Sequence, residues 1–307
     1  KVDQTGSYWY HSHSGFQEMT GVYGGIVIDP ASGYDAVQAD RDYTILLSDW
    51  TDEDPMRVLS KLKVQSDYYN FNQPTVIDFF RDVANDGMKS ALAKRKMWNE
   101  MRMNPTDLAD LSGATLTYLT NGVTPAGNWT GMFRPGEKVR LRFINGTGNT
   151  FYDVRIPGLK LKVIQADGQN LEPVTVDEFR FGPGETYDVV VEPRDEAYTI
   201  FSQSMDRTGY ARGTLAVREG LTAPVPALDK AEWLTMADMM GAMDHGSMQG
   251  MNHGGMSMQG MAGTAMAMDH SQHNMATMAA GNSLKVPSTK ARHARTEYGA
   301  STDMRVD

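Results

Sequence analysis

The sequence predicts a mainly β protein, a β-sandwich or barrel, with one helical insertion and one Met-rich segment. Three observations predict this fold. Short apolar runs separated by turn residues recur between positions 116 and 218, as in proteins built from many short strands. Residues 54–104 show helical spacing instead. Residues 236–278 contain no Val, Leu, Ile or aromatic residue, so we expect no packed core and therefore disorder there.

The first 39 residues are expected to form strands. Residues 7–13 are rich in aromatic side chains, which strands favour, and residues 22–28 form a short apolar run that ends at Asp29-Pro30. A further strand is expected over residues 43–47, just before Ser48-Asp49.

The helical insertion has recognisable boundaries. Asp54 followed by Pro55 is typical of an N-cap and the first helical position, and Val58, Leu59 and Leu62 would share one helical face. A second helical stretch is expected over residues 74–103, with a break at 85–87 and an end before Pro105.

Strands are expected to resume at position 116. Asn121-Gly122 predicts a turn, and residues 135–137 (Pro-Gly-Glu) lead into a strand that alternates apolar and basic residues. Val139, Leu141 and Phe143 would face a core, and Lys138, Arg140 and Arg142 would face solvent on the other side of the sheet. Further strands are expected over residues 151–156, 161–166, 174–180, 187–191, 197–202 and 212–218.

Composition excludes several functional classes. The 307 residues carry a formal net charge of −9 and no Lys/Arg-rich block, which argues against nucleic-acid binding. Cysteine is absent, which excludes disulfides, zinc-thiolate and iron–sulfur sites and cysteine nucleophiles. The sequence contains no run of 18 apolar residues, so we expect no membrane-spanning helix. Positions 1–4 show no targeting segment. Residues 14–244 contain neither His nor Cys, so any soft or borderline metal site is expected at the two ends.

His11 and His13 form the N-terminal candidate site. On a strand, residues two apart point to the same face, with Cα atoms about 6.6 Å apart. Two imidazoles at that spacing suit a pair of ions roughly 3.5–4 Å apart, one ion for each ring, and copper accepts imidazole in both oxidation states. Trp9 would lie on the same face and Ser12 on the other. Taken alone, the motif also fits two partly exposed histidines without a ligand.

The second candidate site is the Met/His-rich segment, residues 236–278, which holds 13 of the 22 methionines. The pattern Met-[Asp/Asn]-His-x-x-Met occurs twice, and a looser copy follows. Thioether sulfur favours Cu(I), and imidazole adds a stronger ligand. A linker or an adaptable apolar surface for a partner is the alternative interpretation, and His293 is expected to be a solvated linker residue. The candidate copper ligands are Met243, His245, Met248, Met251, His253, Met256, Met268, His270, His273 and Met275.

The residues around His11 and His13 resemble a known family. Residues 8–17 (YWYHSHSGFQ) and 21–28 are similar to the second copper-ligand motif of multicopper oxidases, at the end of their first cupredoxin domain. Residues 121–122, 128–131, 135–145 and 166–169 resemble the second cupredoxin domain, and 294–299 resemble the start of the third. The most similar branch is that of the bacterial periplasmic copper-resistance enzymes.

The resemblance implies a cupredoxin-like Greek-key β-sandwich. It implies that His11 binds one copper of the binuclear pair in a trinuclear cluster and that His13 binds the other. It divides the chain into the closing strands of domain one (1–39), a copper-free domain two (40–220) with the helical insertion, a linker with the Met/His-rich copper-binding segment (221–283), and the start of domain three (284–307).

The family's other copper-ligand motifs, including the Cys of the type 1 copper, have no counterpart in these 307 residues. We therefore expect an internal fragment, inactive alone, of a periplasmic oxidase that oxidises Cu(I) or phenolic-type reductants and reduces dioxygen to water. Its expected partners are copper ions, dioxygen, a reductant and periplasmic copper-handling proteins, with no nucleic acid and no membrane span. The alternative is a non-enzymatic protein that sequesters or delivers copper through the Met/His-rich segment.

Overall fold

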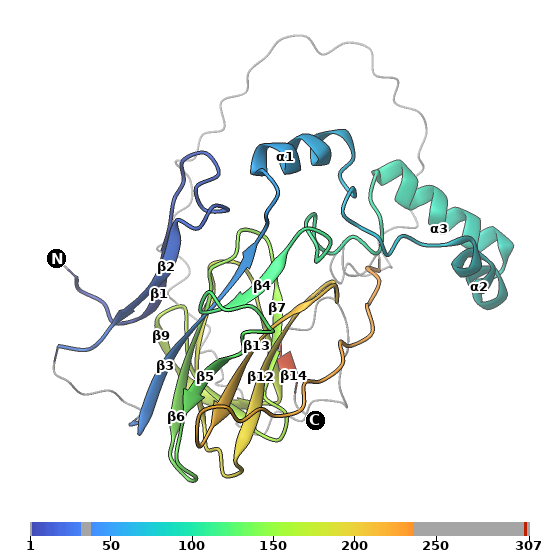
Figure 1. Ribbon diagram of the computed structural model, residues 1–307. Coiled ribbons are helices and arrows are strands. Elements are labelled where there is room, and N and C mark those ends of the chain that lie inside the picture. Colours follow the sequence, from blue (N-terminus) through green and yellow to red (C-terminus); the bar gives the residue numbers. More distant parts are fainter. Residues whose placement is uncertain (1, 32–37, 236–303, 306–307) are drawn as a thin grey trace, which may run out of the picture.

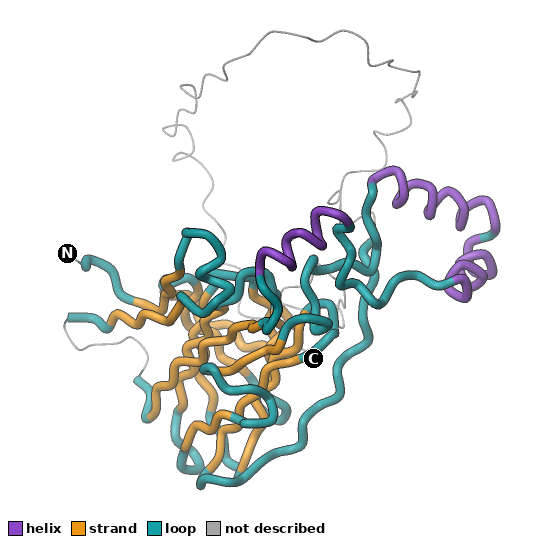
Figure 2. Tube along the Cα trace, turned by 45° about the horizontal axis from the view of Figure 1, so that its top comes forward, coloured by secondary structure: helices purple, strands orange, loops and turns teal. Residues whose placement is uncertain are grey.

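The computed structural model describes residues 2–31, 38–235 and 304–305. Two six-stranded sheets lie face to face, and the helices project beyond one end of the strands (Figure 1). Figure 2 shows the same separation, with the orange strands in one body and the purple helices beyond it. The prediction of a mainly β, cupredoxin-like fold with a helical insertion is confirmed. No helix in this part of the chain is long and apolar enough to cross a membrane.

The first sheet has the strand order β4-β3-β6-β11-β8-β9. Its only parallel pair is β3 with β6, which aligns Arg41 with Val139. The strands are β3 (Arg41–Trp50), β4 (Thr117–Thr120), β6 (Val139–Asn145), β8 (Leu161–Ala166), β9 (Gln169–Val176) and β11 (Thr186–Val191).

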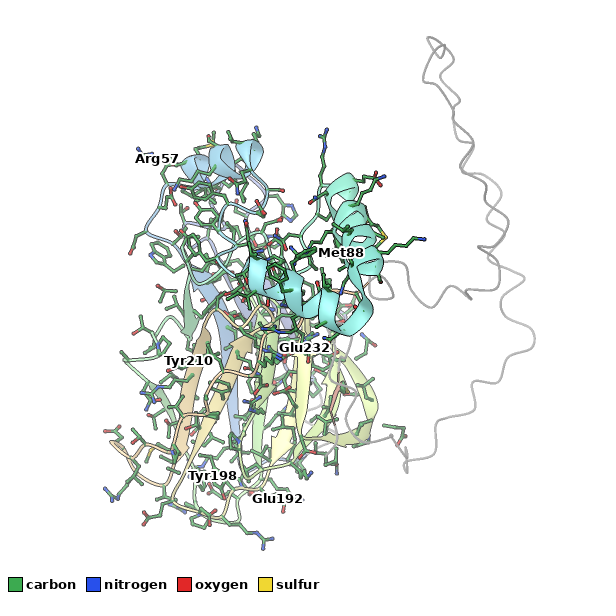
Figure 3. The ribbon with its side chains drawn as sticks, turned by 90° about the vertical axis from the view of Figure 1, so that its right-hand side faces the viewer. Arg57, Met88, Glu192, Tyr198, Tyr210 and Glu232 are labelled. Carbon is green, nitrogen blue, oxygen red and sulfur yellow. The ribbon has the colours of Figure 1, made fainter. Side chains whose placement is uncertain are left out.

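The second sheet has the order β14-β10-β7-β12-β13-β5, with β13 and β5 parallel. Its strands are β5 (Trp129–Met132), β7 (Tyr152–Arg155), β10 (Glu178–Phe181), β12 (Ala197–Ser204), β13 (Tyr210–Ala216) and β14 (Met304–Arg305). Figure 3 views the molecule from the side and shows Tyr198 and Glu192 at the end of the sandwich opposite the helices.

The core lies between the two sheets. Leu141 and Phe143 of β6 and Val189 of β11 are completely buried against residues of the second sheet. Phe143 meets Phe179 edge to face, with ring centroids 5.4 Å apart. Because each such side chain contributes roughly 1.5–3 kcal/mol on burial, this core holds the two sheets together.

The helical insertion begins and ends where the sequence indicates. The Asp54 carboxylate caps α1 (Pro55–Val64) by accepting from two backbone N–H groups of its first turn. Thr75 and Asp78 form a capping box at the start of α2 (Val76–Asp86). Gly87, with φ of +84°, breaks the helix before α3 (Met88–Met101) because a left-handed backbone conformation favours glycine.

A third, two-stranded sheet ends at His11, and Ser12 and His13 follow directly after it. Its strands are β1 (Gly6–His11) and β2 (Tyr23–Ile28), which pair antiparallel with His11 opposite Tyr23. This β1–β2 hairpin contacts β6 and β11 of the first sheet. It lies against the sheet at the left in Figure 1.

The prediction that Lys138, Arg140 and Arg142 face solvent is wrong for two of the three residues. Lys138 is exposed, but Arg140 and Arg142 are buried. The hairpin covers this part of the sheet, and carboxylates compensate the two charges: Asp188 pairs with Arg140, and Asp42 pairs with Arg142. The alternating pattern of β6 therefore separates an apolar core from a buried layer of ion pairs.

Two further differences concern strand boundaries. The strand expected over 174–180 is two strands, because β9 ends at Val176 in the first sheet and β10 begins at Glu178 in the second. No strand was predicted within residues 284–307, yet Met304 pairs with Phe179 and packs against the core.

Candidate metal centre

Close backbone contacts seat the hairpin that carries the candidate site. Gly6 has a φ of +134°, and a Cβ there would come within 2.6 Å of the Gly168 Cα, so this approach requires glycine. A Cβ at Gly25 would lie 2.9 Å from Ile144 of β6. The Thr186 hydroxyl of β11 donates a hydrogen bond of 2.9 Å to the Ser7 carbonyl. Strand β1 is therefore fixed relative to the sandwich before it reaches His11.

The structure brings the rings of His11 and His13 together. Their centroids are 4.3 Å apart, with an angle of 45° between the ring planes. Trp9 stacks on the other side of His11 at 4.0 Å and 5°. The predicted side-by-side arrangement of Trp9, His11 and His13 thus agrees with the coordinates, whereas the metal-ligand roles of the two histidines stay a prediction.

Glu18, which the sequence analysis did not single out, contacts His11. Its Oε2 lies 2.9 Å from His11 Nδ1, and the two side chains are about one quarter exposed. Glu18 belongs to the turn between β1 and β2. Hydrogen bonds hold this turn folded back on the hairpin. These include Ser12 Oγ to Gln17 Oε1 at 2.7 Å and Val22 N to the Gln17 carbonyl at 2.9 Å. The sequence offered one signal for this contact, an acidic residue seven positions after a histidine.

A second acid, the partly buried Asp49, lies near Glu18. Burial raises the pKa of Asp49, the hydrogen bond from the Thr150 hydroxyl (2.6 Å) opposes this rise, and the negative charge of Glu18 adds to it. Burial also raises the pKa of the Tyr23 phenol in the neighbouring strand. Acidic side chains from the turn and from β3 therefore lie near each other here.

The residues present fit part of a copper site. Two neutral imidazoles can each offer one nitrogen to an ion. Within residues 2–31, 38–235 and 304–305, no three His, Asp or Glu side chains come together in a cluster that could hold a metal. The hairpin can therefore supply two ligands, and the others must come from elsewhere.

The Met/His-rich segment does not add to this geometry. The ten candidate copper ligands from Met243 to Met275, and His293, lie outside the described residues. A cavity of about 220 Å³ lies between the α2–α3 pair and Trp233, and no residue of the hairpin lines it.

Comparison with known proteins decides the family. A multicopper oxidase family matches residues 41–220, and a second multicopper oxidase family matches residues 1–33. The chain belongs to the multicopper oxidases. The second match contains His11 and His13, and the first contains both large sheets except for β14. The resemblance seen in the sequence is confirmed.

Individual multicopper oxidases and related proteins show how much of a whole protein this chain represents. It is 63% identical over 270 residues to copper resistance protein A of Escherichia coli. The matched region is 88% of this chain and 44% of that protein. It is 62% identical to copper resistance protein A of Pseudomonas syringae pv. tomato, covering 81% and 41%. The crystal structure of laccase from Botrytis aclada shares the fold, with a TM-score of 0.50 at 22% identity, over 74% of this chain and 38% of that one. The chain spans less than half the length of these relatives.

Proposed function

We propose that this chain is part of a copper-resistance multicopper oxidase and that His11 and His13 bind its binuclear copper pair. One observation carries the proposal: the two rings lie 4.3 Å apart on one side of a hairpin that is seated against the sandwich. The identity of 62–63% to two copper resistance proteins A supports the copper-resistance role.

Each imidazole would hold one ion of the pair. Ions in a dinuclear site lie roughly 3.5–4 Å apart, which is close to the separation of the two rings. The further ligands and the type 1 copper would belong to parts of the parent protein beyond these 307 residues. Bound copper supplies the one-electron chemistry by which a reductant is oxidised and dioxygen is reduced to water.

The surroundings of the rings have two further roles. Trp9 covers one face of His11 and so limits the access of water to it. Glu18 places a carboxylate 2.9 Å from the His11 ring, and negative charge there lowers the electrostatic free energy of bound cations.

The rest of the proposal concerns the whole parent protein. Its reductant would be Cu(I) or a phenolic compound, its compartment the periplasm, and its partners other copper-handling proteins. Residues 40–220 would form a copper-free cupredoxin domain, because residues 14–244 contain no His or Cys. The Met/His-rich segment would collect or deliver Cu(I) through thioether and imidazole ligands.

Non-enzymatic copper sequestration is the less favoured alternative. It would require only the Met/His-rich segment and would assign no role to the His11–His13 pair. The family matches instead cover the hairpin and the sandwich, residues 1–33 and 41–220.

The test compares histidine variants of the full-length parent. His11→Ala and His13→Ala should each lower the copper bound per protein and abolish oxygen uptake, whereas the matched control His293→Ala should leave both unchanged. Full copper content and normal oxygen uptake in both hairpin variants would contradict the proposal.

A second experiment tests the Met/His-rich segment separately. The 307-residue chain and a variant lacking residues 236–278 are titrated with Cu(I) in the presence of a competing chelator. We expect the deletion to remove most Cu(I) binding. Binding that persists after the deletion would contradict the role of this segment.

A further inference from the structure

We propose that Glu18 is a positioning residue of the copper centre: it fixes the tautomer and the ring orientation of His11, so that Nε2 is presented to the metal. This inference rests on the proposed function, because it assumes that His11 is a ligand. It adds a residue that contacts the ligand and not the metal.

The argument begins with the donor and acceptor capacities of the two groups. An ionised carboxylate can only accept hydrogen bonds. Glu18 Oε2 lies 2.9 Å from His11 Nδ1, so this nitrogen must carry the proton in the neutral ring. The lone pair is then on Nε2. A carboxylate that binds the non-ligating N–H of a histidine also raises the basicity of the ligating nitrogen.

The ring also has little freedom to turn. Trp9 stacks on it in parallel at 4.0 Å, and Trp9 itself rests against Gly184, where an added Cβ would lie 3.3 Å from the indole nitrogen. A partial rotation of His11 about its Cβ–Cγ bond would tilt the ring away from Trp9, and a half-turn would keep the stacking but break the hydrogen bond to Glu18. Together the two contacts hold Nε2 in one direction.

The turn places Glu18 close to the sandwich, where its Oε1 would lie 3.6 Å from a Cβ at Gly148. Burial raises the pKa of Asp49, and the negative charge of Glu18 adds to this rise. Two acids in one region repel each other, so this position needs a compensating contact. The contact that the structure provides is His11.

His13 offers an internal comparison. Among the described residues, its ring contacts the ring of His11 but has no hydrogen-bond partner for either nitrogen. The tautomer of His13 should therefore not depend on Glu18.

The first experiment needs no metal. The 307-residue chain, labelled with ¹⁵N-histidine, is studied by long-range ¹H–¹⁵N NMR at about pH 8, above the pKa of histidine in model peptides. We expect His11 to carry its proton on Nδ1. Glu18→Ala should abolish this preference, while Glu18→Gln should keep it, because the amide oxygen is also an acceptor. The His13 signals should be the same in all three proteins.

A His11 proton on Nε2 in the unaltered chain, or an Nδ1 preference that survives Glu18→Ala, would overturn the inference. Unchanged backbone amide signals of the two large sheets show that each variant is folded. If Glu18→Ala does not fold, Glu18→Gln and the unaltered chain still decide the tautomer.

The second experiment measures copper binding by the full-length parent against a competing chelator. Glu18→Ala should weaken binding at the binuclear pair about 10- to 100-fold, the usual effect of losing such a partner, and Glu18→Gln should weaken it less. Unchanged affinity in Glu18→Ala would overturn the positioning role. If His11→Ala also leaves copper binding unchanged, the proposed function fails, and the metal-free tautomer measurement still decides whether Glu18 orients His11.

Discussion

The ion pair beneath the hairpin gives the sharpest prediction about stability. Asp188 Oδ2 accepts hydrogen bonds from Arg140 Nε at 3.0 Å and from its terminal nitrogen at 2.5 Å, and Arg142 lies 3.5 Å away. The side chains of Arg140 and Asp188 are only 4% and 1% exposed. Replacing Asp188 with Asn keeps the shape and removes the negative charge, so that a buried guanidinium loses its carboxylate.

The magnitude follows from this geometry. At an effective dielectric constant of about 20, opposite charges about 4 Å apart attract by about 4 kcal/mol. Breaking a buried pair by removing one partner usually lowers stability by about 3–5 kcal/mol. Burial raises the pKa of Asp188, and hydrogen bonding and the charges of the two arginines oppose this rise. The two contacts of Asp188 Oδ2 with the Arg140 guanidinium have the geometry of an ion pair. The free energy of unfolding should therefore fall by about 3 kcal/mol or more.

Urea unfolding of the 307-residue chain, followed by tryptophan fluorescence, measures this loss. Hydrogen exchange should also become faster in β1 and β2, because the hairpin lies over this pair. The control is Glu100→Gln, which breaks the exposed pair with Lys96 on α3 and should hardly shift the unfolding midpoint. A loss below about 1 kcal/mol for Asp188→Asn would refute the reasoning, because the pair would then behave like a surface pair.

Three further predictions concern other parts of the fold. Burial and neighbouring carboxylates raise the pKa of Asp107 to about 6. The folded state therefore binds the proton of Asp107 more tightly than the unfolded state does. The stability that this proton contributes is lost as pH rises from about 4 to about 6. Asp107→Asn should therefore stabilise the chain at pH 7 by up to about 1 kcal/mol, allowing for solvent screening, and have little effect at pH 4; equal effects at both pH values in thermal melts would contradict this. Thr75→Ala removes the capping box of α2 and should lower stability by about 1 kcal/mol in urea unfolding, with no loss meaning that the cap is dispensable. Leu141→Ala removes a completely buried core side chain and should lower stability by about 2–5 kcal/mol, and a loss under about 1 kcal/mol would show that the core can collapse around the site.

The elements that the sequence predicted correctly depend on local geometry. Asn121 and Gly122 both have positive φ, as the turn prediction requires. Asp54, Thr75 and Gly87 define helix ends through contacts within a few residues. His11 and His13 share one side because side chains two positions apart on an extended backbone point the same way.

The tertiary structure decided the features that join distant segments. Arg142 has the same alternating pattern as an exposed strand residue, and only the packing of the hairpin over β6 buries it against Asp42. Met304 pairs with Phe179, which is 125 positions away, and no local signal marks such a partner.

For the candidate site, the sequence alone determined which two histidines could share a metal pair, because the two-residue period of a strand is a property of the backbone. Only the folded chain brings Glu18 to Nδ1 of His11, because the position of Glu18 depends on how the whole turn folds back on the hairpin. Residue types and spacing thus specify the ligands, whereas the contacts that orient a ligand arise from packing between segments and appear only in three dimensions.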